Sequence, residues 1–230
     1  MSLPTALPAY DLPPTTAATL TADISGASAG WQLDRGRAVL LIHDLQHYFL
    51  RPFAADEAPL ADLMANTLAL RERCTEAGVP VLFSLQPGGQ HVDDRGLLAD
   101  LWGAGPSADD GDVGVPGALA PRPGDARITK HRYSAFFGTL LDETLTELGR
   151  DQLIICGVYA HIGVLATTLS AFMHDIQAFV VADAVADFSR EHHEMALRYI
   201  GQRCGAVRST EQIRAALAST GQPALTSSSA

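Results

Sequence analysis

Short apolar runs alternate along the chain with longer segments of helical period. The runs read as nearly continuous Val, Ile and Leu, as in AVLLIHDL and QLIICGV. Strands of this kind are buried on both faces, which is typical of a parallel sheet covered by helices. The alternation predicts an α/β fold, a three-layer αβα sandwich with a central, mostly parallel sheet. The expected strands are Ala38–Leu45, Val79–Leu85, Ala126–Lys130, Gln152–Val158 and Ala178–Ala182, and the expected helices are Ala58–Ala77, Leu140–Leu148, His161–His174 and Glu191–Arg203.

The same pattern predicts one domain between two irregular ends. Residues 1–30 are rich in Pro, Thr, Ala and Ser without periodicity, so we expect an extended N-terminal arm. Residues 31–220 contain the alternating pattern, and residues 221–230 are expected to be a flexible tail. The segment Gly103–Gly124 is rich in Gly and Pro and longer than an ordinary connection. It is either a lid over a site or a plain flexible insertion.

The composition and the net charge of the chain indicate which kinds of molecule it binds. The chain of 230 residues is 47% hydrophobic and 18% charged, which is typical of a globular protein. Its net charge of −10, with only 16 Lys and Arg, argues against nucleic acid or an anionic membrane as partner, because clustered basic residues bind such surfaces. The sequence shows neither a secretory signal nor an apolar stretch of transmembrane length. We therefore expect a cytoplasmic protein that acts on a small molecule.

Cysteines and metal-ligating residues show no familiar spacing. Cys74, Cys156 and Cys204 form no CxxC pair, and no His completes a zinc site. This argues against a disulfide framework and fits a reducing compartment. The sequence also lacks a glycine-rich phosphate loop of recognised spacing. It therefore implies no cofactor and no metal.

Polar side chains close several of the predicted strands. Asp44 ends AVLLIHD, Gln86 follows VLFSL, Lys130 ends ARITK, and GVYAHIGV begins where QLIIC ends. Taken alone, each residue has a plainer interpretation: a helix cap for the Asp, a turn residue for the Gln and a solvated strand end for the Lys. However, parallel strands deliver their carboxyl ends to one edge of the sheet. The convergence predicts an acid with an electrostatic partner at that edge.

Four blocks of the chain resemble the isochorismatase family of hydrolases: AVLLIHDLQHYFLRPF, TKHRYSAFF, CGVYAHIGVLATTLSAFMHDIQAFVVADAVADFS and EHHEMALRYIGQRCGAV. The resemblance runs from about Tyr10 to the helix near Leu217, and it is strongest to the phenazine-pathway members that cleave 2-amino-2-deoxyisochorismate. It implies an isochorismatase-like fold and hydrolysis of the enolpyruvyl vinyl ether of 2-amino-2-deoxyisochorismate or isochorismate. The products would be pyruvate and trans-2,3-dihydro-3-hydroxyanthranilate or its dihydroxy analogue, in secondary-metabolite biosynthesis.

The resemblance also implies a homodimer and leaves alternatives open. One alternative is an isochorismatase of siderophore biosynthesis, and another is a cysteine-independent relative that hydrolyses some other small anion. A phospho-accepting receiver domain also places an Asp and a Lys at strand ends, but such modules are shorter and cluster extra acids, which His43–Asp44 does not supply. A pseudoenzyme scaffold is disfavoured by the presence of both Asp44 and Lys130.

The resemblance also implies catalytic and binding roles for individual residues. A vinyl ether is opened by protonating its terminal methylene carbon, so the reaction needs a positioned acid. Asp44 would be this acid and Lys130 its catalytic partner, and Lys130 together with Arg95 would hold the two carboxylates of the substrate. Amidase relatives place a cysteine nucleophile where this chain has Gly163, which has no side chain to ionise. The dicarboxylate substrate would be bound by Gln86, Arg95, Tyr159, Gly163, Trp102 and Phe136.

Other conspicuous residues are expected to be structural. His43 faces the opposite side of its strand from Asp44 and is interpreted as a satisfied buried histidine. His161 is expected to orient the turn in which it lies. Asp183 and Asp187 have the spacing of turn and cap residues after a strand.

Overall fold

The computed structural model describes residues 3–12 and 30–218. Most of the expected N-terminal arm (13–29) and the whole of the expected tail (221–230) lie outside the described residues.

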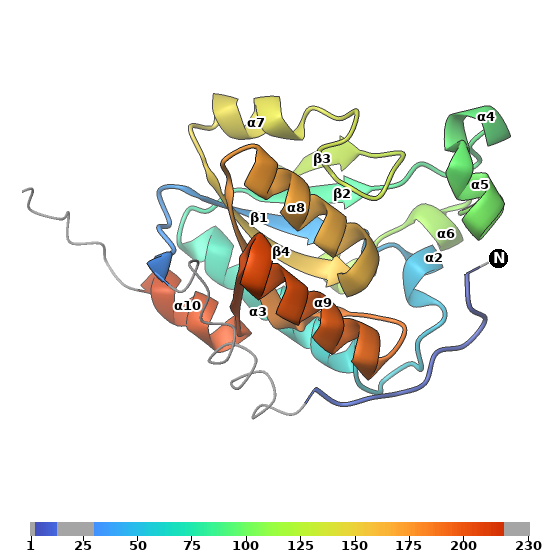
Figure 1. Ribbon diagram of the computed structural model, residues 1–230, viewed down its shortest axis with the longest axis horizontal. Helices are drawn as coiled ribbons and strands as arrows, with labels where there is room; N and C mark the ends of the chain where they lie inside the picture. Colours follow the sequence, from blue (N-terminus) through green and yellow to red (C-terminus); the bar gives the residue numbers. More distant parts are fainter. Residues whose placement is uncertain (1–2, 13–29, 219–230) are drawn as a thin grey trace, which may run out of the picture.

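Parallel strands form the central layer. In the described chain they make one sheet of six strands in the order β3-β2-β1-β4-β5-β6, and all five neighbouring pairs are parallel. The expected parallel α/β sandwich is therefore confirmed (Figure 1). The strands are β1 (Ala38–His43), β2 (Val81–Leu85), β3 (Ala126–Thr129), β4 (Gln152–Val158), β5 (Gln177–Ala186) and β6 (Ala206–Arg208).

Helices cover both faces of this sheet. One face packs against α3 (Leu60–Glu76) and α10 (Thr210–Ala218). The other face packs against α7 (Leu141–Glu147), α8 (Leu165–Met173) and α9 (Arg190–Arg203), and η3 (Ala160–Val164) leads directly into α8. Within the described ranges, each helix is too short or too polar to cross a lipid bilayer. The short helices are α2 (His47–Leu50), α4 (Val92–Arg95), α5 (Leu97–Trp102), α6 (Asp110–Val113) and η2 (Gly117–Leu119).

The residues of β1 explain why the strands show no polar alternation. Val39 and Leu41 pack into the core on the side of α7, α8 and α9, whereas Leu40 and Ile42 pack on the side of α3 and α10. All four are fully buried. Each such side chain stabilises the fold by about 1.5–3 kcal/mol relative to an exposed position. A strand between two helical layers is therefore apolar at most positions on both of its faces.

The expected ends of the strands and helices lie close to those in the structure, except where tertiary contacts determine them. β5 was expected to end at Ala182 but continues to Ala186, past the half-buried Asp183. The Asp183 carboxylate accepts hydrogen bonds from the backbone N and the hydroxyl of Thr210, so its polarity is satisfied inside the fold. The three-residue strand β6 was not predicted, because so short a run carries no period.

The segment Gly103–Gly124 contains α6 and η2 and is tied to the body of the protein. Leu119 is fully buried, and Arg71 of α3 donates to the carbonyl of Ala120. The residues of this segment do not line the cavity described below, which instead is bordered by α4 and α5 immediately before it.

The strand order reverses between β1 and β4, which lie next to each other at the centre of the sheet. Loops that leave two such strands turn toward opposite faces and open a crevice at the carboxyl ends, where ligands bind in folds of this type. Figure 1 shows α2, α4, α5 and α6 gathered at this end of the sheet.

Candidate active site

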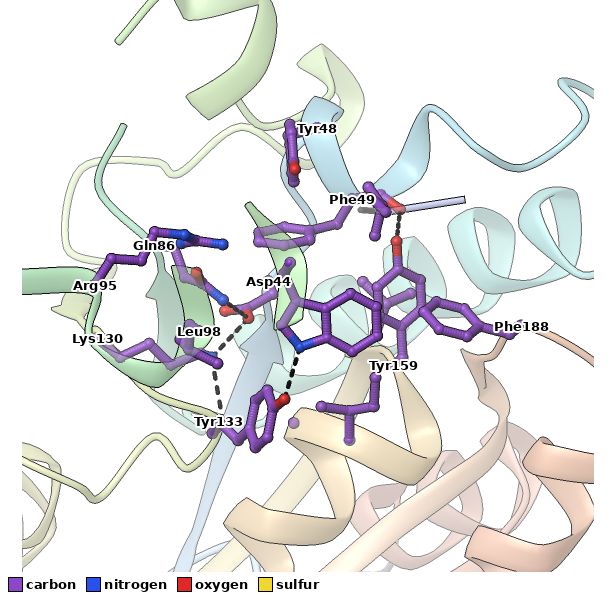
Figure 2. Close-up of a pocket in the computed structure, with 15 residues that line it drawn as sticks. Asp44, Tyr48, Phe49, Gln86, Arg95, Leu98, Lys130, Tyr133, Tyr159 and Phe188 are labelled. Atoms are coloured by element: carbon purple, nitrogen blue, oxygen red, sulfur yellow. Dashed lines mark hydrogen bonds and ion pairs between the residues drawn. The ribbon is translucent and has the colours of Figure 1, made fainter. Parts of the chain in front are cut away.

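A cavity lies at the carboxyl ends of the strands, and β1 to β5 each contribute a lining residue. Asp44 follows β1, Gln86 follows β2, Lys130 follows β3, Gly163 lies just after β4, and Phe188 follows β5. Figure 2 shows side chains from these separate segments turned toward one space. The predicted convergence of strand ends is therefore present in the structure.

Asp44 and Lys130 form a buried ion pair at the polar end of the cavity. Lys130 Nζ lies 2.7 Å from Asp44 Oδ2, and both side chains are almost completely buried. Gln86 Nε2 donates to the same oxygen at 3.3 Å, while Ser84 Oγ donates to Oδ1 at 3.1 Å. Both carboxylate oxygens of Asp44 therefore have donors from neighbouring strands.

The local backbone turns Asp44 away from the strand. Its φ of 53° lies in the left-handed region, which Asp tolerates better than most residues. Gln46 fixes the next turn: its Nε2 donates to the carbonyl of Gln86 and its Oε1 accepts from the Gln86 backbone N, both at 2.8 Å. This amide pair holds the ends of β1 and β2 together. Sequence reasoning missed Gln46, although it lies only two residues after Asp44.

All three donors of the Lys130 ammonium are engaged. Besides Asp44, Nζ donates to the carbonyls of Arg132 at 3.0 Å and Tyr133 at 3.2 Å. An ammonium has three N–H bonds, so Lys130 has no spare donor for a substrate in this arrangement. Its geometry fits a partner of Asp44 better than a binder of a substrate carboxylate.

Arg95, unlike Lys130, has a donor that is not engaged by the described residues. Its Nε donates to the carbonyl of Gly103 at 2.6 Å, but its Nη1 is buried and makes no hydrogen bond with the described residues. Figure 2 shows the guanidinium turned toward the cavity. Burial lowers the pKa of Arg95, so an anion beside it would compensate for the lost solvation. Gly105 packs against this group, and a Cβ at that position would lie 2.4 Å from Arg95 Cζ.

Aromatic rings line the other end of the cavity. Trp102 donates from Nε1 to the hydroxyl of Tyr133 at 2.7 Å, which fixes the indole. Tyr159 donates to the carbonyl of Phe49 at 2.6 Å, and its ring lies edge-on to Phe188 with centroids 4.6 Å apart. These fixed rings form an apolar wall beside the ion pair.

Gly163 leaves no space for a side chain. A Cβ there would lie 2.4 Å from Cε1 of His43, whose ring is held at the Val158 carbonyl (3.0 Å) and at Thr167 Oγ1 (3.1 Å). Burial lowers the pKa of His43 to about 4, so the ring is neutral near pH 7. The interpretation of His43 as structural is confirmed by these contacts. A cysteine nucleophile does not fit at this position.

The cysteines present are also unsuited to nucleophilic chemistry. Cys74, Cys156 and Cys204 are free and buried, and burial raises the pKa of Cys156 to about 12. The thiolate is the reactive form, and it is scarce at such values. Among the described residues, no three His, Cys, Asp or Glu side chains gather as a metal site would require.

Asp187 anchors the turn that follows β4. Its carboxylate accepts from the backbone N of His161 at 2.7 Å and from the backbone N of Phe188 at 2.8 Å, and it contacts Nδ1 of His161 at 2.5 Å. The structural role expected of Asp187 and the turn-orienting role expected of His161 are therefore both present.

One expected binding residue is absent from the cavity. Phe136 does not line it; its ring stacks on His174, with centroids 5.1 Å apart, and packs in the core beneath α7 and α8. The expectation for Phe136 is therefore corrected. The backbone between Lys130 and Phe136 turns, so that Tyr133 faces the cavity and Phe136 faces the core. The other expected residues, Gln86, Arg95, Trp102, Tyr159 and Gly163, do line the cavity.

Several lining residues were missed by sequence reasoning. Tyr48 and Phe49 lie in α2, which begins three residues after Asp44, and Phe188 is the second residue after β5. A rule that considers every residue just beyond a strand end would have found them. Leu3, which comes from the N-terminal segment, carries no such signal.

Comparisons with known proteins agree with this geometry. An isochorismatase domain model matches residues 38–212. The chain is 50% identical to a probable isochorismatase of Pseudomonas chlororaphis, over 80% of this chain and 88% of the relative. It is 49% identical to the phenazine biosynthesis protein PhzD of Pseudomonas fluorescens, over 83% and 91% of the two chains. It is 44% identical to enterobactin synthase component B of Escherichia coli K12, over 83% of this chain and 67% of that protein.

Solved structures share the same fold. An isochorismatase family protein from Burkholderia thailandensis superposes with a TM-score of 0.73 and 27% identity, covering 82% of this chain and 98% of the other. A cysteine hydrolase from Pseudomonas syringae pv. phaseolicola gives a TM-score of 0.73 at 22% identity, covering 82% and 95%. The latter comparison concerns the fold alone.

Proposed function

Because this chain belongs to the isochorismatase family of hydrolases, we propose that it cleaves the enolpyruvyl vinyl ether of 2-amino-2-deoxyisochorismate or isochorismate and releases pyruvate. The observation that carries this proposal is the buried pair of Asp44 and Lys130, open to a cavity with an aromatic wall and a guanidinium nitrogen that has no partner among residues 3–12 and 30–218. The 49–50% identity to the Pseudomonas relatives favours phenazine-type biosynthesis.

The proposed reaction begins with proton transfer from Asp44. In the proposed substrate complex Asp44, a carboxylate paired with Lys130 in the ligand-free protein, carries a proton taken from solvent, because the negative charge of the bound substrate disfavours a second anion beside it. The carboxylic acid then gives this proton to the terminal methylene carbon of the substrate, and the electron pair of the C=C bond forms the new C–H bond. The resulting oxocarbenium ion is captured by water, which returns a proton to the Asp44 carboxylate. The hemiketal then collapses to pyruvate and the ring alcohol. No covalent enzyme intermediate is needed, which is consistent with the absence of space for a thiol at Gly163.

Lys130 is proposed to stabilise the charge that develops as the proton leaves Asp44. Negative charge then grows on Asp44 Oδ2, which lies 2.7 Å from the ammonium and 3.3 Å from Gln86 Nε2. Donors already aimed at the position of developing charge lower the barrier without reorganisation. The carbonyls of Arg132 and Tyr133 keep the ammonium in place.

Substrate binding is proposed to use the two remaining surfaces of the cavity. Arg95 Nη1, buried and unpaired in the described chain, would bind a substrate carboxylate. The rings of Trp102 and Tyr159 would pack against the cyclohexadiene ring. A local cation of this kind offsets the repulsion of a dianion by a chain with a net charge of −10.

We further propose a cytoplasmic homodimer without a metal or other cofactor. Exposed apolar residues on the outer helices support the dimer: Leu169, Phe172 and Met173 on α8, and Met195 and Tyr199 on α9. The free cysteines support a reducing compartment.

The proposal is tested by incubating the purified protein separately with isochorismate and with 2-amino-2-deoxyisochorismate, and measuring pyruvate with a coupled dehydrogenase. One equivalent of pyruvate per substrate is expected. Folded protein that releases pyruvate from neither compound would refute it.

Siderophore biosynthesis is the second candidate, favoured by the 44% identity to enterobactin synthase component B. The two substrates differ by a hydroxyl or an amine at one ring carbon, and a site that merely tolerates either group discriminates weakly. A kcat/KM at least about tenfold higher for isochorismate would favour the siderophore assignment, and the reverse ratio would favour the phenazine assignment.

A further inference from the structure

The N-terminal segment, residues 3–12, lies against the candidate active site although it is remote from it in sequence. Leu3 lines the cavity. The backbone N of Leu7 donates to the Pro52 carbonyl at 2.7 Å, and that of Tyr10 donates to the Ala58 carbonyl at 3.2 Å. Leu3 and Leu7 are partly buried against the core cluster on the side of α3. Figure 1 shows this segment, in dark blue, passing α2 and the lower end of α9.

The Tyr10 hydroxyl joins this segment to the end of β5. It accepts a hydrogen bond from the backbone N of Asp187 at 2.8 Å and lies 3.1 Å from Nδ1 of His193. The other ring nitrogen of His193 lies 3.0 Å from the carbonyl of Ala182, which can only accept. Nε2 therefore carries the proton, and Nδ1 accepts from the Tyr10 hydroxyl. The hydroxyl thus uses both its donor and its acceptor capacity on buried groups.

Asp187 connects Tyr10 with the wall of the cavity. Its carboxylate holds the backbone N of His161 and that of Phe188. The turn containing Ile162 and Gly163, together with Phe188, borders the cavity. Tyr10 therefore contacts Asp187, and Asp187 in turn holds the groups that shape the apolar end of the site.

We propose that residues 3–12 form a strap that completes the active-site wall, with Leu3 as a substrate-contacting residue and Tyr10 as the positioning residue that latches the strap to Asp187 and His193. The inference rests on the proposed function, because it assigns these residues to binding of the same substrate. The strap is held by a few hydrogen bonds, three half-buried leucines and the edge-on contact of the Tyr10 ring with His193, whereas the other walls belong to the sheet and its loops. It can therefore release for substrate entry and close over the bound ring.

The test uses Tyr10→Phe and Leu3→Ala in the full chain, with pyruvate release from the preferred substrate as readout. Releasing the latch lowers the fraction of protein with a complete site, so KM is expected to rise about five- to tenfold in Tyr10→Phe. Removing the leucine side chain is expected to raise KM about tenfold. In both variants kcat should stay within about twofold of wild type, because neither residue takes part in the proposed proton transfer. Tyr199→Phe removes a hydroxyl from an exposed position of α9 and should leave both constants unchanged.

A KM equal to that of wild type in both variants would overturn the strap. A fall of kcat and of thermal stability at constant KM would show a merely structural role and would also overturn it. If Tyr10→Phe does not fold, Leu3→Ala decides alone, since its half-buried side chain is not part of the central core.

Hydrogen exchange separates this inference from the proposed function. If the wild-type protein releases no pyruvate, the proposed function has failed, yet the latch is still measurable in the protein without ligand. Tyr10→Phe should then accelerate exchange of the amides of Leu7 and Asp187 while leaving those of β4 unchanged. Unchanged exchange in residues 3–12 would overturn the latch, whatever the substrate.

Discussion

At the residue scale, Asp44 is the group on which the proposed chemistry depends. Asp44→Asn keeps one oxygen that can accept from Lys130 and turns its NH2 group toward the Ser84 hydroxyl, which can accept, but it removes the acid, so kcat should fall at least about 100-fold. Steady-state kinetics of pyruvate release measure this, with circular dichroism to verify the fold. Asp142→Asn, on the exposed side of α7, is the matched control and should retain full activity. Turnover of Asp44→Asn within a few-fold of wild type would remove Asp44 from the mechanism.

Gly163 provides a steric prediction at the same scale. A Cβ at this position would lie 2.4 Å from His43, so Gly163→Cys should destabilise the fold by about 1–3 kcal/mol and create no amidase activity. Urea unfolding measures the first effect. Gly111→Ala, where a Cβ would meet no atom within 4 Å, should unfold at the wild-type urea concentration or above. A Gly163→Cys variant as stable as wild type would show that the ring of His43 moves aside.

His43 makes stability depend on pH. Its pKa falls from the ordinary 6.5 to about 4 on folding because burial disfavours the charged ring. Between these values the unfolded chain binds the proton and the folded chain does not. Above about pH 6.5 the neutral His43 therefore costs the folded protein no stability. As the pH falls from 6.5 toward 4, the free energy of unfolding decreases, by up to about 3 kcal/mol.

The measurement is the free energy of unfolding in urea at pH 7, 6 and 5. We expect a flatter pH dependence for His43→Gln than for wild type. The exposed His91 serves as the control site, and His91→Gln should follow the wild-type slope. Parallel slopes for wild type and His43→Gln would contradict the assignment of the titration to His43.

At the element scale, two Arg–Asp pairs differ strongly in burial. Arg71 of α3 is almost completely buried and pairs with Asp125, just before β3; Arg37 pairs with Asp151 at an exposed position just before β4. Asp125→Ala leaves a buried guanidinium uncompensated and should cost about 3–5 kcal/mol. Asp151→Ala should cost less than about 1 kcal/mol. Equal losses of unfolding free energy in the two variants would contradict the idea that Arg71 anchors the segment before β3 to α3.

At the scale of the whole molecule, the exposed apolar side chains of α8 and α9 predict self-association. Met173 is 69% exposed and Phe172 48% exposed, which suits a surface covered by a second copy. Sedimentation velocity should show a dimer for the wild type and a shift toward monomer for Met173→Glu. Arg214→Glu, on α10 at the opposite face of the sheet, should remain a dimer. A wild-type monomer at micromolar concentration would exclude the dimer.

Much of the architecture followed from the sequence because it depends on local pattern. Unbroken Val, Ile and Leu runs require two covered faces, so β1, β2 and β4 could be located within two residues of their ends. Asp44, Gln86 and Lys130 could be grouped from the sequence because parallel strands end at one edge of the sheet. Cys156 could be interpreted as a buried residue because it lies inside an apolar strand.

Other features were decided only by the tertiary structure. Phe136 and Tyr133 lie three residues apart with similar character, and only the path of the loop sends one to the core and the other to the cavity. Arg95 has a nitrogen without a partner in the described part of the chain, whereas Lys130 is fully engaged, and both outcomes depend on which carbonyls surround each group. The approach of Leu3 and Tyr10 to the site joins residues more than 170 positions apart, as in Tyr10 and Asp187. Hydrophobic period reports which face of an element is buried, but long-range hydrogen bonds leave no period in the sequence, so partners of this kind emerge only when the chain is folded.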